Sequence, residues 1–425
     1  MTESYPAWLG IDWADEKHRW AMRVAGEGSN EQGELAHTPE AIESFVVDLA
    51  TRFPGCRIAV ALEQSRGALL FMLSKYAHVV LYPIHPNTLD HYRKSFYPSG
   101  AKSDPGDAAL ILEVLTKHPE RLRAFEPDTV LTRTLQFLVE ARREAVDDKT
   151  RYSNRLTAQL KLYWPQLLAW FKVDAVVLGQ LLLKWSTLER LQAAKPASRA
   201  KFLRQHRLSA ARVEELQQAI ATAIPAIQDR AVIESSVLIV PLLVGQMEVL
   251  RASIAQQDRR LAELTEAHPD HDIFASLPGA GPVMLPRLIA AFGTQRGRFA
   301  TAFQMQCFSG IAPVTSSSGQ HTWVHWRWAC PKFLRQTFHE WAWLSTRTSK
   351  WARACYDQLR AKGKSHHAAV RALAFKWLRI LFRCWQNRRP YQETRYLQSL
   401  KKPAKPVEIH LKTTNKLTSL KELLS

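Results

Sequence analysis

Apolar and polar positions along the first 125 residues change their period several times. Strand-like runs occur in AWLGIDWA, HRWAMRVAG, RIAVALEQ and HVVLYPIH, where apolar residues are continuous or alternate with polar ones. Helix-like runs lie between them, in PEAIESFVVDLATRF, GALLFMLSKYA and DPGDAALILEVLTKH. A hairpin followed by strands that alternate with helices predicts a mixed sheet covered by helices on both faces. We therefore expect residues 1–125 to form an α/β domain.

From residue 126 to residue 268 the pattern becomes helical. TVLTRTLQFLVEARREAVDDKTRYSNRLTAQLKLY is charged, with apolar residues at helical spacing along its length. A second long segment carries an apolar seam with coiled-coil spacing, made of Leu243, Met247, Leu250, Ile254, Leu261 and Leu264. Two such helices predict a coiled-coil connector. A plain helical bundle packed on the first domain is an equally good interpretation of this pattern.

The third region, residues 269–392, is predicted to be mainly helical and is rich in Trp and Arg, as in HTWVHWRWACPKFLRQTFHEWAW. Its first segment, LPGAGPVMLPRLIAAFG, resembles a helix-hairpin-helix turn, in which glycine amides approach a phosphate, although such turns also serve packing alone. Residues 393–425 form a basic, weakly apolar tail that we expect to be flexible or to fold on a partner. The expected fold class is therefore α/β followed by an all-α part.

Composition narrows the class of partner. The 425 residues include 58 Lys and Arg against 39 Asp and Glu, a formal charge of +19, which favours nucleic acid over other partners. The basic residues are spread along the chain, which disfavours an acidic membrane surface. Unbroken apolar stretches such as VLIVPLLV fall short of the roughly 20 residues of a membrane span, and no leader peptide is apparent. Five scattered cysteines without a CxxC indicate reduced thiols, so we expect a cytoplasmic protein.

Four acidic residues are candidates for chemistry. Asp12 and Glu63 follow buried strand-like runs, where a carboxylate is costly unless a cation meets it. Asp104 and Asp107 flank Pro105 and Gly106 at the start of an apolar helix. Together the four could bind one or two divalent cations, Mg²⁺ or Mn²⁺, through hard oxygen ligands and so support phosphoryl transfer.

Each acid also has an ordinary structural interpretation. Asp12 could be a turn residue and Glu63 a loop charge, while Asp104 and Asp107 could cap a helix whose first position is Pro105. Each of these interpretations is about as good as the catalytic one when it is taken alone. The hypothesis that all four acids have only these structural roles, in a basic protein, is weaker than the hypothesis of a shared metal site.

These motifs resemble a known family. GIDWA, ALEQS and KSDPGDA are similar, in order and spacing, to the three acidic motifs of the DEDD transposases of bacterial insertion sequences, the IS one-ten group related to the Piv DNA invertase. The resemblance implies a RuvC-like first domain with a ribonuclease-H fold, whose catalytic tetrad falls on Asp12, Glu63, Asp104 and Asp107. It also implies magnesium or manganese as the cofactor and DNA, at the element ends and the target, as the substrate.

The resemblance extends to the third region. SLPGAGPVMLPRLIAAFG and FATAFQMQCFSGIAPVTSSSGQ are similar to that family's C-terminal transposase domain, which carries a serine nucleophile before a glycine and after a G-x-x-P segment. The G-x-x-P segment matches residues 310–313, and the nucleophile then falls on Ser318. Ser316 and Ser317 are adjacent, so a flexible serine-rich loop is the competing interpretation. The sequence after Ser318 has fewer Gly and Ser residues than is usual in the family.

The resemblance further implies a structured guide RNA that pairs with both DNAs. Tryptophans of the third region could stack on unpaired bases, although a helix core is their more common role: Trp323, Trp326, Trp328, Trp341 and Trp343. Arg327, Lys332 and Arg335 lie among them and are the predicted phosphate contacts, with an ordinary exposed basic face as the alternative.

The sequence thus predicts a DNA recombinase of a mobile element that uses a serine nucleophile and a metal-binding acidic tetrad. Two alternatives stay open. One is a RuvC-like junction-resolving nuclease in which water attacks, and the other is a non-catalytic nucleic-acid-binding scaffold. Because four strands must be cut and rejoined, we expect a homo-oligomer, a dimer or tetramer, with subunits meeting at the heptad helix.

Overall fold

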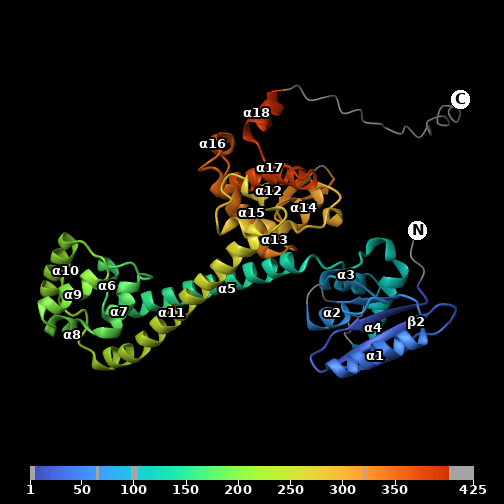
Figure 1. The fold of residues 1–425 in the computed structure, drawn as a ribbon, viewed down its shortest axis with the longest axis horizontal. Helices are drawn as coiled ribbons and strands as arrows, with labels where there is room; N and C mark the ends of the chain where they lie inside the picture. Colours follow the sequence, from blue (N-terminus) through green and yellow to red (C-terminus); the bar gives the residue numbers. More distant parts are fainter. Residues whose placement is uncertain (1–4, 64–66, 97–103, 320, 402–425) are drawn as a thin grey trace. The chain divides into compact units, whose positions relative to one another are not determined.

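A computed structural model describes residues 5–63, 67–96, 104–319 and 321–401 (Figure 1). Contacts between residues divide the chain into two units, residues 1–127 and 128–425. The Gln64–Ser65 end of the ALEQS motif, Lys102 and Ser103 of KSDPGDA, and residues 402–425 of the expected tail lie outside the described residues.

The first unit is built on a five-stranded sheet with the order β3-β2-β1-β4-β5. Its strands are β1 (Ala7–Asp12), β2 (Lys17–Val24), β3 (Glu31–Ala36), β4 (Ile58–Leu62) and β5 (Val79–Pro83). β1 pairs in parallel with β4, and β4 with β5, whereas β2 is antiparallel to both of its neighbours. The predicted mixed sheet is therefore confirmed.

Helices cover both faces of this sheet because alternate strand residues are apolar on each side. Leu9, Ile11 and Leu62 pack with α1 (Pro39–Arg52) and α2 (Ala68–Leu73). Ala59 and Ala61 face the other way and pack with residues of α3 (Pro86–Phe96) and α4 (Asp104–Lys117). The N-terminal region is thus a mixed α/β layer structure.

The second unit is organised by two long helices, α5 (Val130–Tyr163) and α11 (Arg230–Glu266), which pack along each other. They run antiparallel, since Gln159 donates a hydrogen bond to Ser236 while Arg142 is paired with Asp258. The predicted seam lies on this interface: four of its residues are buried, namely Leu243, Met247, Leu261 and Leu264. Thr129 caps α5, and Asp229 caps α11, because each side chain accepts a hydrogen bond from a first-turn amide.

Two hydrophobic clusters lie at the two ends of this helix pair. One contains Leu160 of α5 and Val244 of α11, together with the short helices between them. Those helices are α6 (Gln166–Trp170), α7 (Val176–Lys184), α8 (Leu188–Ala193), α9 (Pro196–Gln205) and α10 (Ala210–Thr222). The other cluster contains Leu135 of α5 and Leu264 of α11 and forms the core of the C-terminal region.

The C-terminal region is mainly helical, as predicted. Its helices are α12 (His271–Ala275), α13 (Met284–Phe292), α14 (Ala302–Phe308), α15 (Lys332–Ser345), α16 (Lys350–Ala361), α17 (His366–Gln386) and α18 (Glu393–Lys401). An antiparallel hairpin interrupts them, formed by β6 (Val314–Ser318) and β7 (His321–His325). The helical interpretation of HTWVHWRW is therefore wrong, because its first half pairs as a strand with the serine-rich segment.

The apolar part of α11 corrects the expectation that no segment of the chain is long and apolar enough to span a membrane. By length and composition alone this helix could cross a membrane, although core helices of soluble proteins meet the same criterion. Unbroken apolar runs along the chain are short, but α11 joins several of them in one helix with few charges. One side of α11 packs on α5. Leu238, Leu242 and Val249 lie on another side of the helix and are largely exposed.

Candidate active site and nucleic-acid interface

Two of the predicted acids lie at the carboxyl ends of neighbouring parallel strands. β1 ends at Asp12, and Glu63 directly follows β4. Ile11 lies opposite Leu62 in the parallel register, so Asp12 and Glu63 are the next residues on adjacent strands. Both side chains are half-buried. Parallel pairing therefore brings together two carboxylates that are 51 positions apart in the sequence.

Gly10 allows the first turn of α4 to approach these carboxylates. A Cβ at Gly10 would lie 2.5 Å from both the Ala108 carbonyl oxygen and the Leu112 amide nitrogen, so no side chain fits between strand and helix. Asp12 is two residues beyond Gly10 and, by strand alternation, faces the same side of the sheet. Asp107 directly precedes Ala108 in α4. Asp12, Glu63 and the start of α4 consequently share one face of the sheet.

Asp107 is buried and carries a countercharge from another helix. Its side chain is 7% exposed, and its Oδ1 accepts a hydrogen bond from Nη2 of Arg93 in α3 at 2.5 Å. Arg93 is 20% exposed, so this ion pair is largely shielded from water. Asp107 is therefore more than a helix-start charge in solvent. Asp104 begins α4, and its side chain lies outside the described residues.

The donor set of this face suits a hard divalent cation. Carboxylate oxygens are the ligands that Mg²⁺ and Mn²⁺ prefer, and Asp12, Glu63 and Asp107 offer them from three elements. Among the side chains that the structure describes, no group of three His, Cys, Asp or Glu residues is already close enough to hold a metal ion. Arg93 holds Asp107 instead, so a metal ion would have to replace this guanidinium as the counterion.

A histidine pair fixes the loop after Asp12. The Ala14 amide donates to Nδ1 of His18, which leaves Nε2 of His18 to donate to Nδ1 of His37 at 2.8 Å. Burial, together with the smaller effect of the neighbouring His37, lowers the pKa of His18 to about 4. His18 is therefore neutral at pH 7, and it ties the β1–β2 loop to β3.

The predicted nucleophile lies at the tip of the C-terminal hairpin. Ser318 ends β6, is exposed, and pairs across the hairpin with His321. Gly319 follows with φ +57°, a left-handed conformation that favours glycine in a tight turn. At the base of the hairpin, Gly310 has φ +72°, and a Cβ there would overlap the Cys330 side chain. The glycines of the G-x-x-P and S-G motifs therefore shape the two ends of this hairpin.

The serine with a hydrogen-bonded imidazole is Ser316, not Ser318. Nε2 of His325 lies 3.0 Å from the Ser316 Oγ, and Nδ1 of His325 lies 3.1 Å from the Trp326 carbonyl oxygen. A carbonyl accepts, so Nδ1 carries the proton and Nε2 accepts from the serine hydroxyl. Within the described part of the hairpin, no such contact joins Ser318 to a base. The sequence analysis missed this pair because the two residues meet through strand pairing.

The tryptophans of the third region divide into two groups. Trp341 is fully buried and Trp343 packs against the same core, as their helical spacing in α15 allows. Trp323 and Trp328 are 50% and 75% exposed. Two members of the predicted stacking set are therefore core residues, and the hairpin region supplies the accessible ones.

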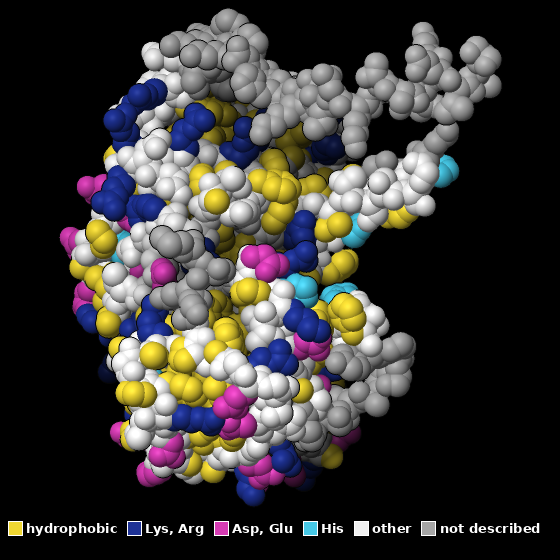
Figure 2. All heavy atoms as spheres, turned by 90° about the vertical axis from the view of Figure 1, so that its right-hand side faces the viewer, with side chains coloured by type: hydrophobic (Ala, Val, Ile, Leu, Met, Phe, Trp, Pro, Cys, Tyr) yellow, Lys and Arg dark blue, Asp and Glu magenta, His cyan; other side chains and the backbone are white. Residues whose placement is uncertain are grey.

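The predicted phosphate contacts surround the hairpin base. Arg327 and Arg335 are half-buried and Lys332 is exposed. Elsewhere, Lys and Arg side chains are scattered over the face of the molecule seen in Figure 2, with hydrophobic side chains between them. Gly279, from the proposed phosphate-binding turn, instead packs against the α15 backbone, because a Cβ there would lie 2.8 Å from the Ser345 amide nitrogen. That observation favours the packing interpretation of the turn.

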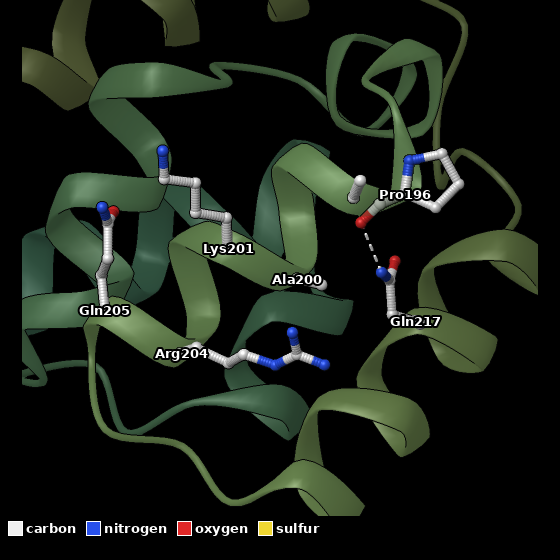
Figure 3. A pocket seen from close by; sticks show the side chains of 7 residues that line it. Pro196, Ala200, Lys201, Arg204, Gln205 and Gln217 are labelled. Atoms are coloured by element: carbon white, nitrogen blue, oxygen red, sulfur yellow. Dashed lines mark hydrogen bonds between the residues drawn. The ribbon is translucent and has the colours of Figure 1, made fainter.

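An open pocket of about 660 Å³ lies on α9 and α10 (Figure 3). Lys201, Arg204 and Gln205 line it from α9, and Gln217 of α10 closes one side by donating a hydrogen bond to the Pro196 carbonyl at 2.7 Å. None of the predicted site residues lies in this pocket, so its shape does not identify the site of the chemistry.

Comparison with known proteins identifies the family of this chain. A model of DEDD-type transposases named for IS110 matches residues 9–165, which include all four predicted acids. A model described as "Transposase IS116/IS110/IS902 family" matches residues 271–357, which include the serine hairpin. The chain is thus a transposase, an enzyme that cuts and rejoins DNA. It belongs to the IS110 family of insertion-sequence transposases.

Several relatives match along nearly their whole length. The "Mini-circle putative transposase for IS117" of Streptomyces coelicolor is 26% identical over 92% of this chain and 97% of its own. The 43.6 kDa protein of insertion element IS110 from the same organism is 26% identical over 90% and 94% of the two chains. The 42 kDa protein of IS900 from Mycobacterium paratuberculosis is 27% identical over 89% and 95%.

Proposed function

We propose that this transposase transfers DNA strands through a covalent intermediate on Ser318, supported by a divalent metal ion on Asp12, Glu63, Asp104 and Asp107. The observation that carries the metal site is the shared face of Asp12, Glu63 and the first turn of α4, which Gly10 makes accessible. The strand order β3-β2-β1-β4-β5, in which only β2 runs opposite to the other four strands, supports a RuvC-like ribonuclease-H fold for this unit.

The serine hydroxyl would attack a phosphodiester phosphorus. The Ser318 Oγ–P bond forms while the bond from phosphorus to a deoxyribose oxygen breaks, so the phosphodiester energy is kept in a phosphoserine. The freed deoxyribose oxygen takes up a proton, and a deoxyribose hydroxyl of the new partner strand later displaces the serine. Rejoining therefore requires no further energy source.

A metal ion, magnesium or manganese, would neutralise charge that develops on the phosphoryl oxygens. The protein's own part is to hold two carboxylates by strand pairing and a third by the packing of α4 on Gly10. The acids and Ser318 belong to different units, so the reaction requires that they meet, either within one chain or between subunits.

A homo-oligomer suits that requirement, and α11 supports it. Leu238, Leu242 and Val249 are 79%, 60% and 67% exposed and recur every four and seven residues, on a side of α11 other than its buried seam. An apolar stripe of this kind is typical of helix pairing between subunits. We therefore keep the prediction of a dimer or tetramer with contacts along α11.

An element-encoded guide RNA is the second predicted partner. The charge of +19, scattered over the surface seen in Figure 2, supports a protein that holds nucleic-acid backbones while base pairing selects the sequence. Sequencing the RNA that co-purifies with the protein tests this part. Recovery of random cellular RNA, with no enrichment of the element's own non-coding segment, would remove the guide from the proposal.

Trapping a protein–DNA adduct tests the nucleophile. Wild-type protein, incubated with labelled element-end DNA and Mg²⁺ and then denatured, should give a covalent band that Ser318→Ala abolishes. Ser317→Ala, whose side chain lies on the other face of β6, is the matched control and should keep the band. A band that persists in Ser318→Ala, or that requires Ser316, would contradict the assignment. Cleavage without any adduct would favour the junction-resolving nuclease.

A further inference from the structure

Several basic side chains next to the serine hairpin have no acidic partner. Among the described residues, no carboxylate lies within ion-pair distance of Arg327, Arg335 or Arg371. Arg327 and Arg335 donate to backbone carbonyls, of Ala312 at 3.4 Å and of Arg327 at 3.3 Å. The Nε of Arg371 is buried and has no hydrogen-bond partner in the described structure.

Other shielded arginines of the same region are paired. Arg287 is bound to Glu340 and Arg296 to Asp270, both with hydrogen-bonded geometry. The C-terminal region therefore supplies carboxylates to the guanidinium groups of Arg287 and Arg296 but not to those beside the hairpin. A guanidinium that is partly removed from water without a counterion is costly unless an external anion completes the site.

The two uncompensated arginines share one aromatic platform. Arg335 lies on α15 and Arg371 on α17, and their guanidinium carbons are 5.0 Å and 3.2 Å from the centre of the Trp326 ring. Stacking on an indole fixes the plane of a guanidinium while leaving its N–H groups available at the edge. Burial and the positive charge of Arg335 lower the pKa of Arg371, because both disfavour its charged form.

We propose that Arg335 and Arg371, supported by Trp326, form a binding site for a backbone phosphate of the DNA strand that is cut. A pair of planar guanidinium groups matches the oxygens of a phosphodiester, which accept hydrogen bonds at two positions. The proposal rests on the proposed function for its choice of DNA, since the site adjoins the hairpin that carries Ser318.

The position of the platform defines which phosphate is bound. Trp326 directly follows β7, whose last residue His325 pairs with Val314, at the opposite end of β6 from Ser318. Four residues of strand correspond to about 13 Å. The arginine pair therefore holds a phosphate that flanks the attacked one, so it positions the strand and takes no part in bond breaking.

Binding measurements with salt titration test the site. The probes are a fluorescein-labelled oligo(dT) strand, a labelled oligo(U) strand and a labelled random DNA duplex. Each is titrated with the full-length protein, and fluorescence anisotropy is the signal. Arg371→Gln and Arg335→Gln should each weaken DNA binding by about tenfold at moderate salt and lower the slope of log K against log salt by about one. Arg371→Lys, which keeps the charge but loses the planar fork, should give a smaller loss.

A matched control separates a built site from a general positive field. Arg379 lies on the same helix as Arg371 and is exposed. Unlike Arg371, it does not stack on the Trp326 ring. Arg379→Gln removes the same charge and should weaken binding by less than about twofold. Trp326→Leu leaves the net charge unchanged and should still weaken binding by several-fold, because the platform is lost.

Equal losses for Arg371→Gln and Arg379→Gln, or no loss for Trp326→Leu in a folded protein, would overturn the site. So would a loss confined to an RNA strand, with DNA binding unchanged. The two proposals fail separately. If both arginine variants bind DNA normally while the adduct still requires Ser318, the phosphate site is wrong and the proposed function stands. If they lose DNA binding but no adduct forms in any variant, the phosphate site stands and the serine mechanism is wrong.

Discussion

The acid-bearing face of the first unit and the serine hairpin of the second differ in how firmly the fold holds them. The acids are positioned by a five-stranded sheet and by a helix that touches the backbone of β1 at Gly10. Ser318 lies at the exposed end of a two-stranded sheet, with a glycine turn beyond it. A metal site needs fixed ligands, whereas a nucleophile that forms and releases a bond to DNA must reach its substrate. The contrast suits the roles that we propose for the two regions.

The largest effect is expected from removing the carboxylates at the start of α4 while keeping the helix. Asp104→Ser combined with Asp107→Asn retains good capping residues but replaces the charged ligands, so cleavage of labelled element-end DNA should fall at least about a thousandfold. Arg93→Gln is the matched control, because it removes the ion partner of Asp107 but leaves the carboxylate. It should keep most cleavage in Mg²⁺. Similar losses in both would mean that the ion pair, and not metal binding, is what matters.

The second largest effect is expected from disrupting the contact between β1 and α4 at Gly10. Gly10→Val would place side-chain atoms against the Ala108 carbonyl and the Leu112 amide, so the free energy of unfolding of the first unit should fall by about 2–4 kcal/mol. Urea denaturation followed by tryptophan fluorescence measures this loss. Gly28→Ala, at a glycine with open space around its Cβ position, should change stability by less than about 0.5 kcal/mol. A well-tolerated Gly10→Val would refute the close approach of α4.

The pH dependence of the free energy of unfolding should report the neutral His18 that fixes the loop after Asp12. His18 has a pKa of about 4 in the folded protein and an ordinary pKa near 6.5 when unfolded. Between these values the unfolded state binds more protons, so stability should fall as pH drops from 6.5 toward 4, by about 3 kcal/mol at most. Denaturation at several pH values, compared between wild type and His18→Gln, measures this. Equal pH slopes for both proteins would show that His18 is not the group responsible.

The smallest effect is expected from Ser316, which is partly exposed. Ser316→Ala removes the hydroxyl that donates to His325, so the stability of the second unit should change by about 1 kcal/mol or less. The yield of protein–DNA adduct should stay near that of wild type. A variant that folds normally but forms no adduct would transfer the role of nucleophile to the serine that has a histidine partner.

The sequence predicted the parts of the fold that burial patterns mark. Strands such as RIAVALEQ and long helices such as α5 have continuous or periodic apolar positions, and both were found. β3 was missed, because its EQGELA sequence is that of a polar edge strand. α3 was missed as well, since it buries Leu89 among mostly polar residues. The absence of α3 from the prediction explains why the pairing of Arg93 with Asp107 could not be foreseen.

The candidate site divides in the same way. The motifs that carry the acids could be found because each follows or precedes a strong apolar run. Arg335 was predicted as a phosphate contact, but its grouping with Trp326 and Arg371 was not. The three residues come from separate segments of the chain, and no short-range spacing relates them. The hairpin was hidden by its composition: a serine run followed by alternating Trp, Val and His has neither a strong strand pattern nor a clear helical one.

The antiparallel pair of α5 and α11 also sets the distance between the two hydrophobic clusters of the second unit. The 34 residues of α5 correspond to a length of about 51 Å, and the two hydrophobic clusters occupy its two ends. Each residue inserted into both helices would lengthen the pair by about 1.5 Å and rotate one end against the other by about 100°. An insertion of seven residues in each helix nearly restores the orientation of one cluster relative to the other. An insertion of two residues instead rotates the distal cluster to the opposite side of the helix pair. Length changes in this segment are therefore tolerated in steps of a heptad and not residue by residue.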